Sequence, residues 1–145
     1  MSNREEILDL MHRYAFLIDN GEIEEWASLF EHGEWGAEGS PLLVGKDALV
    51  EMINAFIRIY PDGTPRTRHA ISNVSISIDE ANNSASAISY ITLSQQTDEF
   101  PLQVIFTGEY HDRFERVDGH WRFAKRVTKR PFLGDMSAHN KKTFG

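Results

Sequence analysis

The sequence predicts an α+β fold in which helices come first and a mainly antiparallel sheet follows. Up to about residue 60, apolar residues recur every three or four positions, as on one face of a helix. After Pro65 they alternate with polar residues, as along a strand with one buried face. Asp118-Gly119 then separates two alternating segments and is typical of a two-residue hairpin turn. We expect one domain over residues 1–145.

The first helix is expected to follow Ser2, because Ser2 and Glu5 have the spacing of a capping box. Its apolar face is formed by residues at helical intervals: Ile7, Leu10, Met11, Tyr14 and Ile18. Asp19-Asn20-Gly21 is expected to end this helix, since Gly21 can adopt a positive φ.

Two further helices are predicted before Pro65. The short second helix carries four apolar residues at helical spacing: Ile23, Trp26, Ala27 and Phe30. Trp35 follows in a glycine-rich segment that predicts a short strand or loop. The third helix is expected to start near Gly45 and to run to Tyr60, where Pro61-Asp62-Gly63 ends it.

Four strands are expected to form an antiparallel meander on these helices. The inner face of the third strand is predicted to consist of alternate residues: Leu102, Val104, Phe106, Gly108, Tyr110, Asp112 and Phe114. The Asp118-Gly119 turn fixes the register of the last hairpin, so that Phe114 faces Phe123 and Glu115 faces Arg122. The tail over residues 131–145 is weakly patterned and is expected to be loosely held.

Composition excludes several classes of function. A net charge of −7 and a pI near 5.3 disfavour nucleic acid and anionic membranes as partners. The absence of cysteine removes disulfides and thiolate chemistry. No apolar run reaches the roughly 20 residues of a membrane-spanning helix, and no signal core is present, so we expect a cytoplasmic protein. No motif indicates a nucleotide cofactor or a metal site, and five histidines are expected at the surface: His12, His32, His111, His120 and His139.

The segment YHDRFERVDGHWRF, from Tyr110 to Phe123, resembles the last hairpin of the nuclear transport factor 2-like superfamily. Over residues from about 4 to 130 the chain is similar to the SnoaL-like group, with a cone-shaped α+β fold. That group includes scytalone dehydratase, bile-acid dehydratase and hexachlorocyclohexane dehydrochlorinase. Its lyases carry Tyr-x4-Asp at the end of the first helix and a His at the start of the first long strand.

These motif positions correspond here to Tyr14, Asp19 and His69, and the resemblance implies that they are catalytic. Arg126 stands where dehydrochlorinase-like members have an arginine. Dioxygenase small subunits and ketosteroid isomerase share the fold with other roles, so the fold alone does not decide the function. The chain also lacks a clear second acidic residue at 84–93, which departs from the dehydratase pattern.

The residues themselves leave structural alternatives open. Asp19 fits a turn, His69 could bond only to backbone groups, and Tyr14 could be a core residue. His69 lies on the inner face of its strand together with Val74 only if a bulge occurs near Ser72-Asn73. Strict alternation points Arg126 away from the interior unless a bulge intervenes, and Arg68 is the competing cation.

The favoured hypothesis is a cofactor-independent lyase that eliminates water or halide from a small apolar or cyclic substrate. His69 would remove a proton, Asp19 would orient it and Tyr14 would stabilise the oxygen or leaving group. The pocket wall is expected to contain Tyr110, Trp26, Phe30, Trp35, Phe56, Tyr90 and Phe106.

The alternatives are an isomerase or cyclase in the same pocket, or a non-catalytic ligand-binding or scaffold domain. An Asp19–His69 distance within about 3.2 Å beside an open apolar cavity would favour the enzyme, whereas a packed interior would favour the scaffold. We also expect a homodimer through the outer sheet face, which would carry Gln103, Ile105, Thr107, His111, Arg113, Arg122 and Ala124.

Overall fold

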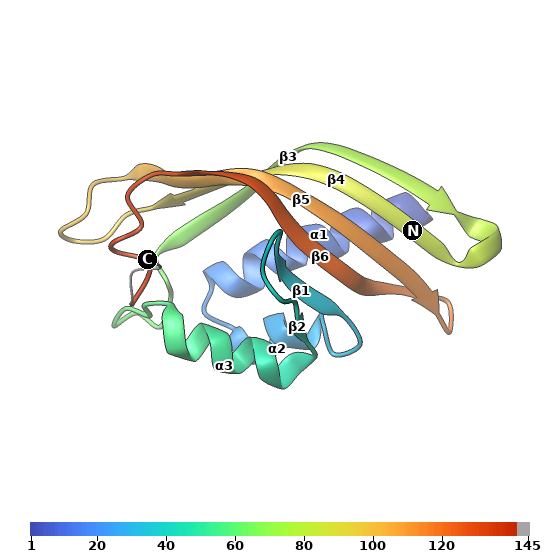
Figure 1. Cartoon of the computed structure of the whole chain (residues 1–145), viewed down its shortest axis with the longest axis horizontal. Helices are drawn as coiled ribbons and strands as arrows, with labels where there is room; N and C mark the ends of the chain where they lie inside the picture. The colour runs from blue at the N-terminus through green and yellow to red at the C-terminus, as the bar shows by residue number, and fades with distance from the viewer. Residues whose placement is uncertain (142–145) are drawn as a thin grey trace.

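The computed structural model describes residues 1–141 and confirms the α+β class, with three helices under one open, curved sheet (Figure 1). The helices are α1 (Asn3–Asp19), α2 (Ile23–Ser28) and α3 (Lys46–Phe56). The strands are β1 (Glu34–Ala37), β2 (Leu43–Val44), β3 (Thr67–Asp79), β4 (Ser84–Gln95), β5 (Gln103–Val117) and β6 (His120–Leu133). None of the helices in this part of the chain is long and apolar enough to span a membrane.

The sheet is larger than the predicted four-stranded meander. Its strand order is β2-β1-β6-β5-β4-β3, and β1 runs parallel to β6 while all other pairs are antiparallel. The parallel pairing places Trp35 of β1 opposite Arg126 of β6. The sheet is therefore mixed, and the glycine-rich segment around Trp35 supplies its two short strands.

Different residues determine where α1 begins and where it ends. At the start, the Ser2 hydroxyl oxygen accepts a hydrogen bond from the Glu5 backbone N–H at 3.1 Å. At the end, Gly21 has φ +76°, and a Cβ built there would lie 1.9 Å from the Gly63 carbonyl oxygen. Only glycine permits this approach, which brings the end of α1 beside the loop that leads into β3.

The third helix ends at Phe56, not at Tyr60 as predicted. Ile57 is already extended, with φ −103° and ψ 134°, and pairs with Asn140 in an isolated bridge. The helical spacing of apolar residues continues to Tyr60, but tertiary pairing with the C-terminal segment overrides it there.

A bulge in β3 sets the direction of His69, as the sequence predicted. The pairing of β3 with β4 shifts between Ser72 and Ser75, and Asn73 adopts φ +54°. His69 on one side of the shift and Val74 on the other are both partly buried, in spite of their opposite parity.

Two of the three other register shifts between β4, β5 and β6 change the predicted faces of β5 and β6. Close to the turn the prediction is confirmed, since Phe114 pairs with Phe123 and Glu115 with Arg122. A shift between Arg113 and Phe114 then places Arg126 opposite Asp112, with its side chain fully buried. Arg126 therefore faces inward, and the strict alternation that pointed it outward was wrong.

The second shift, between Leu93 and Ser94, reverses the start of β5. Ile105 is fully buried although we expected it on the outer face. Leu102 and Val104, which were expected to point inward, are exposed. Before a bulge, the residues of a strand that face inward and outward are exchanged relative to those after it, and the alternating sequence pattern does not reveal this.

The segment after β6 is anchored, in contrast to the predicted loose tail. Strand β6 continues through Leu133, and the Ala138 carbonyl accepts hydrogen bonds from Gln95 Nε2 at 3.1 Å and from the Tyr60 hydroxyl. The Lys141 backbone N–H donates to the Phe56 carbonyl at 2.7 Å. Residues 142–145 of the predicted tail lie outside the described residues.

Candidate active site

The structure brings Asp19 and His69 together, fifty positions apart in the sequence. His69 Nδ1 lies 2.6 Å from Asp19 Oδ1, and the two side chains are 12% and 9% exposed. The distance is within the range that the enzyme hypothesis required. The pair is held where the last residue of α1 meets the start of β3.

The Asp19 carboxylate is fixed by two further donors. The Thr67 hydroxyl donates to Oδ1 at 2.8 Å, and the His69 backbone N–H donates to Oδ2 at 2.8 Å. Both donors come from β3, so the strand that carries the imidazole also orients the carboxylate. With Nδ1–H donated to Asp19, the Nε2 atom of His69 carries the free lone pair and can accept a proton.

A groove opens beside this pair, between α1 and the edge strand β3. It has a volume of about 490 Å³. The lining residues come from these two elements and the turn after α1: His12, Ala15, Phe16, Asp19, Asn20, Arg68, His69 and Ile71. His69 therefore lines a cavity of the size that small ligands occupy.

Tyr14 lies between the Asp19–His69 pair and the interior. Its ring meets the His69 ring edge to face, with the centroids 6.3 Å apart. Its hydroxyl accepts a hydrogen bond from Trp35 Nε1 at 2.9 Å. Tyr14 is 4% exposed and is not among the residues that line the groove, so it contacts His69 from the interior side.

The interior contains a second charged pair, Arg126 with Asp112. The guanidinium donates two hydrogen bonds of 2.8 Å to the carboxylate, and both side chains are 0% exposed. The cation also lies 3.7 Å from the Tyr110 ring centroid and 4.3 Å from that of Tyr14. We name these two charged residues with Tyr14, Tyr110 and Phe123 the interior cluster.

The pKa values in the interior cluster follow from burial and pairing. Burial alone lowers the pKa of Arg126, but the Asp112 carboxylate more than offsets this, so the pKa lies above its ordinary value. Burial raises the pKa of Tyr110 well above its ordinary value, and the neighbouring Tyr14 raises it further. Arg126 therefore remains a cation and Tyr110 a neutral phenol.

The other predicted wall residues lie apart from the groove. Trp26 and Phe30 are buried and pack against Tyr14 edge to face. Trp35, Phe56 and Phe106 are partly buried. Tyr90 is 49% exposed and was wrongly placed in the pocket, because alternate residues of β4 face outward and Tyr90 is one of them.

His139 was expected at the surface, yet it is partly buried. Its Nδ1 atom is enclosed and has no hydrogen-bond partner among the described residues. The pKa of His139 is lowered to about 4, mainly by burial and also by a charge on the nearby His69, while the Asp19 carboxylate opposes the shift. The anchored C-terminal segment thus adds a neutral imidazole near the pair, and no periodic pattern in the tail could have revealed it.

Comparisons with known proteins agree with this fold. The sequence model of a family described as a SnoaL-like domain matches residues 1–127. The small oxygenase component of a p-cumate 2,3-dioxygenase system from Pseudomonas putida is 28% identical, and the match covers 93% of this chain and 81% of that one.

Two solved structures from Novosphingobium aromaticivorans are also similar. A proposed scytalone dehydratase is 28% identical with a TM-score of 0.70, covering 94% of this chain and 91% of the other. An NTF2-like protein with a cystatin-like fold is 22% identical with a TM-score of 0.72, covering 94% and 84%. The second likeness shows the fold alone, and the predicted NTF2-like fold is confirmed.

Proposed function

The chain belongs to the SnoaL-like domain family, and from this premise we propose that it is a cofactor-independent lyase. The substrate would be a small apolar or cyclic molecule bound in the groove between α1 and β3. The single observation that carries this proposal is the 2.6 Å contact between His69 and Asp19 at the wall of that groove. A carboxylate-oriented imidazole that lines a cavity is suited to general-base catalysis.

In the proposed reaction His69 Nε2 takes a proton from a substrate carbon. The C–H electron pair forms the new double bond, and the bond to a neighbouring hydroxyl or halide breaks with its electrons. Asp19 stabilises the imidazolium, which returns its proton to the oxygen when water leaves or releases it to solvent when halide leaves. Tyr14 acts as a positioning residue in this scheme, because its ring contacts His69 and its hydroxyl is engaged by Trp35.

Arg126 has a different role in this proposal from the catalytic one that the resemblance implied. Its side chain is fully enclosed in the interior cluster and does not line the groove. We assign it to the stability of the sheet.

The proposal is tested by screening hydroxylated and halogenated ring compounds for elimination. On a substrate so found, His69→Ala and Asp19→Asn are each expected to lower kcat by about 10²–10⁴-fold. His32→Ala is the matched control, since His32 is exposed, does not line the groove and should change kcat little. Activity within a few-fold of wild type in both variants of the pair would refute the mechanism.

An isomerase or cyclase using the same base is the close variant. It would depend on His69 and Asp19 in the same way, so product analysis separates it from a lyase. A product of unchanged mass indicates rearrangement, whereas loss of water or hydrogen halide indicates elimination.

A non-catalytic role is favoured by a different observation. The interior cluster is packed with aromatic rings, and one relative is the small component of an oxygenase, not named as a catalytic subunit. Under this alternative the Asp19–His69 pair would join α1 to β3 structurally. Asp19→Asn would then lower the free energy of unfolding, and no screened compound would react.

The outer face of the sheet supports a further proposal, a homodimer. Exposed apolar side chains from three strands lie away from the helices: Ile88, Tyr90, Val104 and Phe132. Light scattering at micromolar concentration should give twice the mass of the chain, and Tyr90→Asp should shift it to monomer. A wild-type protein that is only monomeric would contradict this proposal.

A further inference from the structure

The groove beside the Asp19–His69 pair has one apolar wall. Phe16 is 68% exposed on the outer side of α1, and Ile71 of β3 and Ala15 of α1 complete the wall. Covering an exposed aromatic ring with another apolar group is favourable by about 25 cal/mol per Å² of apolar surface removed from water. The wall is therefore suited to a flat or branched hydrocarbon group.

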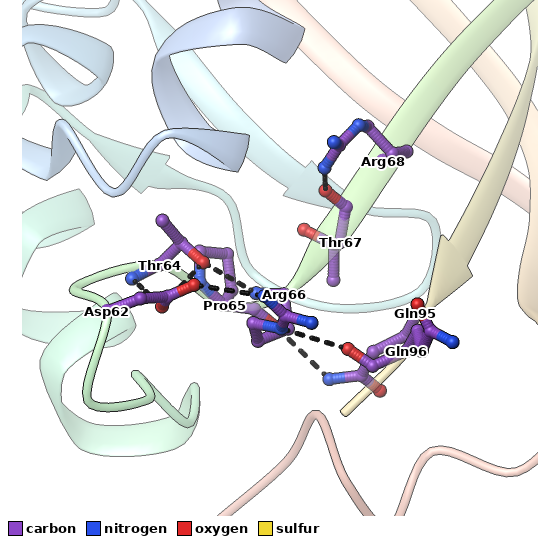
Figure 2. Close-up of polar contacts among 8 residues, drawn as sticks. All are labelled: Asp62, Thr64, Pro65, Arg66, Thr67, Arg68, Gln95 and Gln96. Carbon is purple, nitrogen blue, oxygen red and sulfur yellow. Dashed lines mark hydrogen bonds and ion pairs between the residues drawn. The ribbon is translucent and has the colours of Figure 1, made fainter. Parts of the chain in front are cut away.

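The same groove carries a cation that lacks an acidic partner. Arg68 forms no ion pair with any carboxylate of the described residues, and its printed contact is with the Thr67 carbonyl at 3.3 Å. Figure 2 shows the guanidinium folded back along β3 to that carbonyl, while Arg66 binds Asp62 and the Gln96 carbonyl. The chain has a net charge of −7, so carboxylates are plentiful, yet none of them within residues 1–141 pairs with Arg68. The position of this arginine beside His69 is therefore not explained by pairing within the fold.

The groove also contains an opposing charge, which limits where an anion can bind. The Asp19 carboxylate lines it, but its oxygens already accept three hydrogen bonds, from Thr67 and from the ring and backbone of His69. His12, on the opposite wall, adds positive charge only when protonated. An anionic group is therefore favoured at the Arg68 end, where a guanidinium offers the paired donors that match a carboxylate.

We infer that the ligand of this groove is a carboxylate attached to a ring or branched hydrocarbon, with the carboxylate on Arg68 and the hydrocarbon against Phe16 and Ile71. The inference rests on the proposed function and names the substrate class of the same site. Arg68 and His69 both line this groove, so a carboxylate held by Arg68 leaves an attached ring in the same cavity as the imidazole.

The test uses benzoate and benzyl alcohol as probes, titrated into isotope-labelled full-length protein and followed by NMR. Benzoate is expected to shift the signals of Ala15, Phe16, His69 and Ile71, with Arg68→Gln weakening its binding about three- to tenfold. Arg113→Gln is the matched control, since it removes the same charge from an exposed position on β5 and should change the affinity less than twofold. Benzyl alcohol lacks the charge and should bind both variants equally.

Other outcomes would overturn the inference. Benzoate that shifts signals outside the groove, or that does not bind at all, contradicts it. So does an Arg68→Gln variant that weakens benzoate and benzyl alcohol to the same extent. Because this titration involves no proton transfer, it can fail while the His69 variants still lose activity, and the two proposals are thus tested separately.

Discussion

Two acid–base pairs of this protein differ in their access to solvent. Asp112 and Arg126 are fully buried in the interior cluster, whereas Asp19 and His69 lie at the wall of a groove. Both carboxylates are fixed by short hydrogen bonds, of 2.8 Å in the interior and 2.6–2.8 Å at the groove. Similar bonding thus holds a pair inside the packed interior in one region and a pair at the wall of a groove in the other.

The basic side chain of each pair explains this division. The guanidinium of Arg126 does not lose its proton, and the Asp112 carboxylate raises its pKa further. An imidazole, unlike a guanidinium, can act as a base through a ring nitrogen. Of these two pairs, the one at the groove therefore combines a possible base with a place for a ligand.

The largest expected effect is on stability, from breaking the interior pair. Arg126→Met should lower the free energy of unfolding by about 3–5 kcal/mol, because it leaves the Asp112 carboxylate buried without its partner. Urea unfolding measures this change. The double variant Arg126→Met/Asp112→Leu should recover most of the loss, and a single variant as stable as wild type would contradict the structural role.

The next effect concerns His139 and depends on pH. Its pKa is lowered to about 4 by burial, so between pH 6.5 and pH 4 the unfolded chain binds a proton that the folded chain does not. Stability from this group is fully present above pH 6.5 and falls, by on the order of 2 kcal/mol for a partly exposed side chain, as the pH drops to 4.

The variant His139→Gln should therefore show a smaller loss of stability over that pH range than wild type. Thermal unfolding at several pH values measures the difference, with His32→Gln as an exposed control that keeps the wild-type slope. Parallel slopes for wild type and His139→Gln would show that this imidazole titrates normally.

A smaller effect is expected from removing one hydrogen bond that holds the Asp19 carboxylate in place. Thr67→Val removes one of the hydrogen bonds to Asp19 and should lower the free energy of unfolding by about 1 kcal/mol. The turnover number should also fall, because the carboxylate that orients His69 is less firmly held. Thr107→Val on β5 is the control, and equal kcat values for both variants would argue against this support.

The smallest effect is expected at the surface. Glu115 and Arg122 form a 2.7 Å ion pair across the last hairpin, with both side chains more than a third exposed. Glu115→Gln should cost less than about 1 kcal/mol, since solvent screens such pairs. If Glu115→Gln lowered the free energy of unfolding as much as Arg126→Met does, burial would not be what distinguishes the exposed pair from the interior pair.

The sequence predicted those parts of the molecule that depend on local pattern. The Asp118-Gly119 register and the Ser2 cap were confirmed. The contact between Asp19 and His69 was expected from the resemblance to SnoaL-like lyases, and the structure has it at 2.6 Å. The bulge near Asn73 was predictable because His69 and Val74 would otherwise face opposite sides.

What could not be predicted depends on distant contacts. The register shifts in β4–β5 and β5–β6 place Ile105 and Arg126 inward, and no local signal marks them. His139 lies in a segment without periodicity, and its position follows from bonds between Ala138 and the distant residues Gln95 and Tyr60. These features arise from tertiary pairing, which single-sequence periodicity does not encode.

The irregular step at Ser72–Ser75 has a consequence for how this protein tolerates change. Substituting Ser72, Val74 or Ser75 keeps the residue count between His69 and the rest of β3, and the imidazole still reaches α1. Deleting one residue would regularise the pairing and rotate the first part of the strand by half a repeat, turning the ring toward water. The number of residues in this short stretch therefore controls the direction of His69 more than the identity of most of its side chains does.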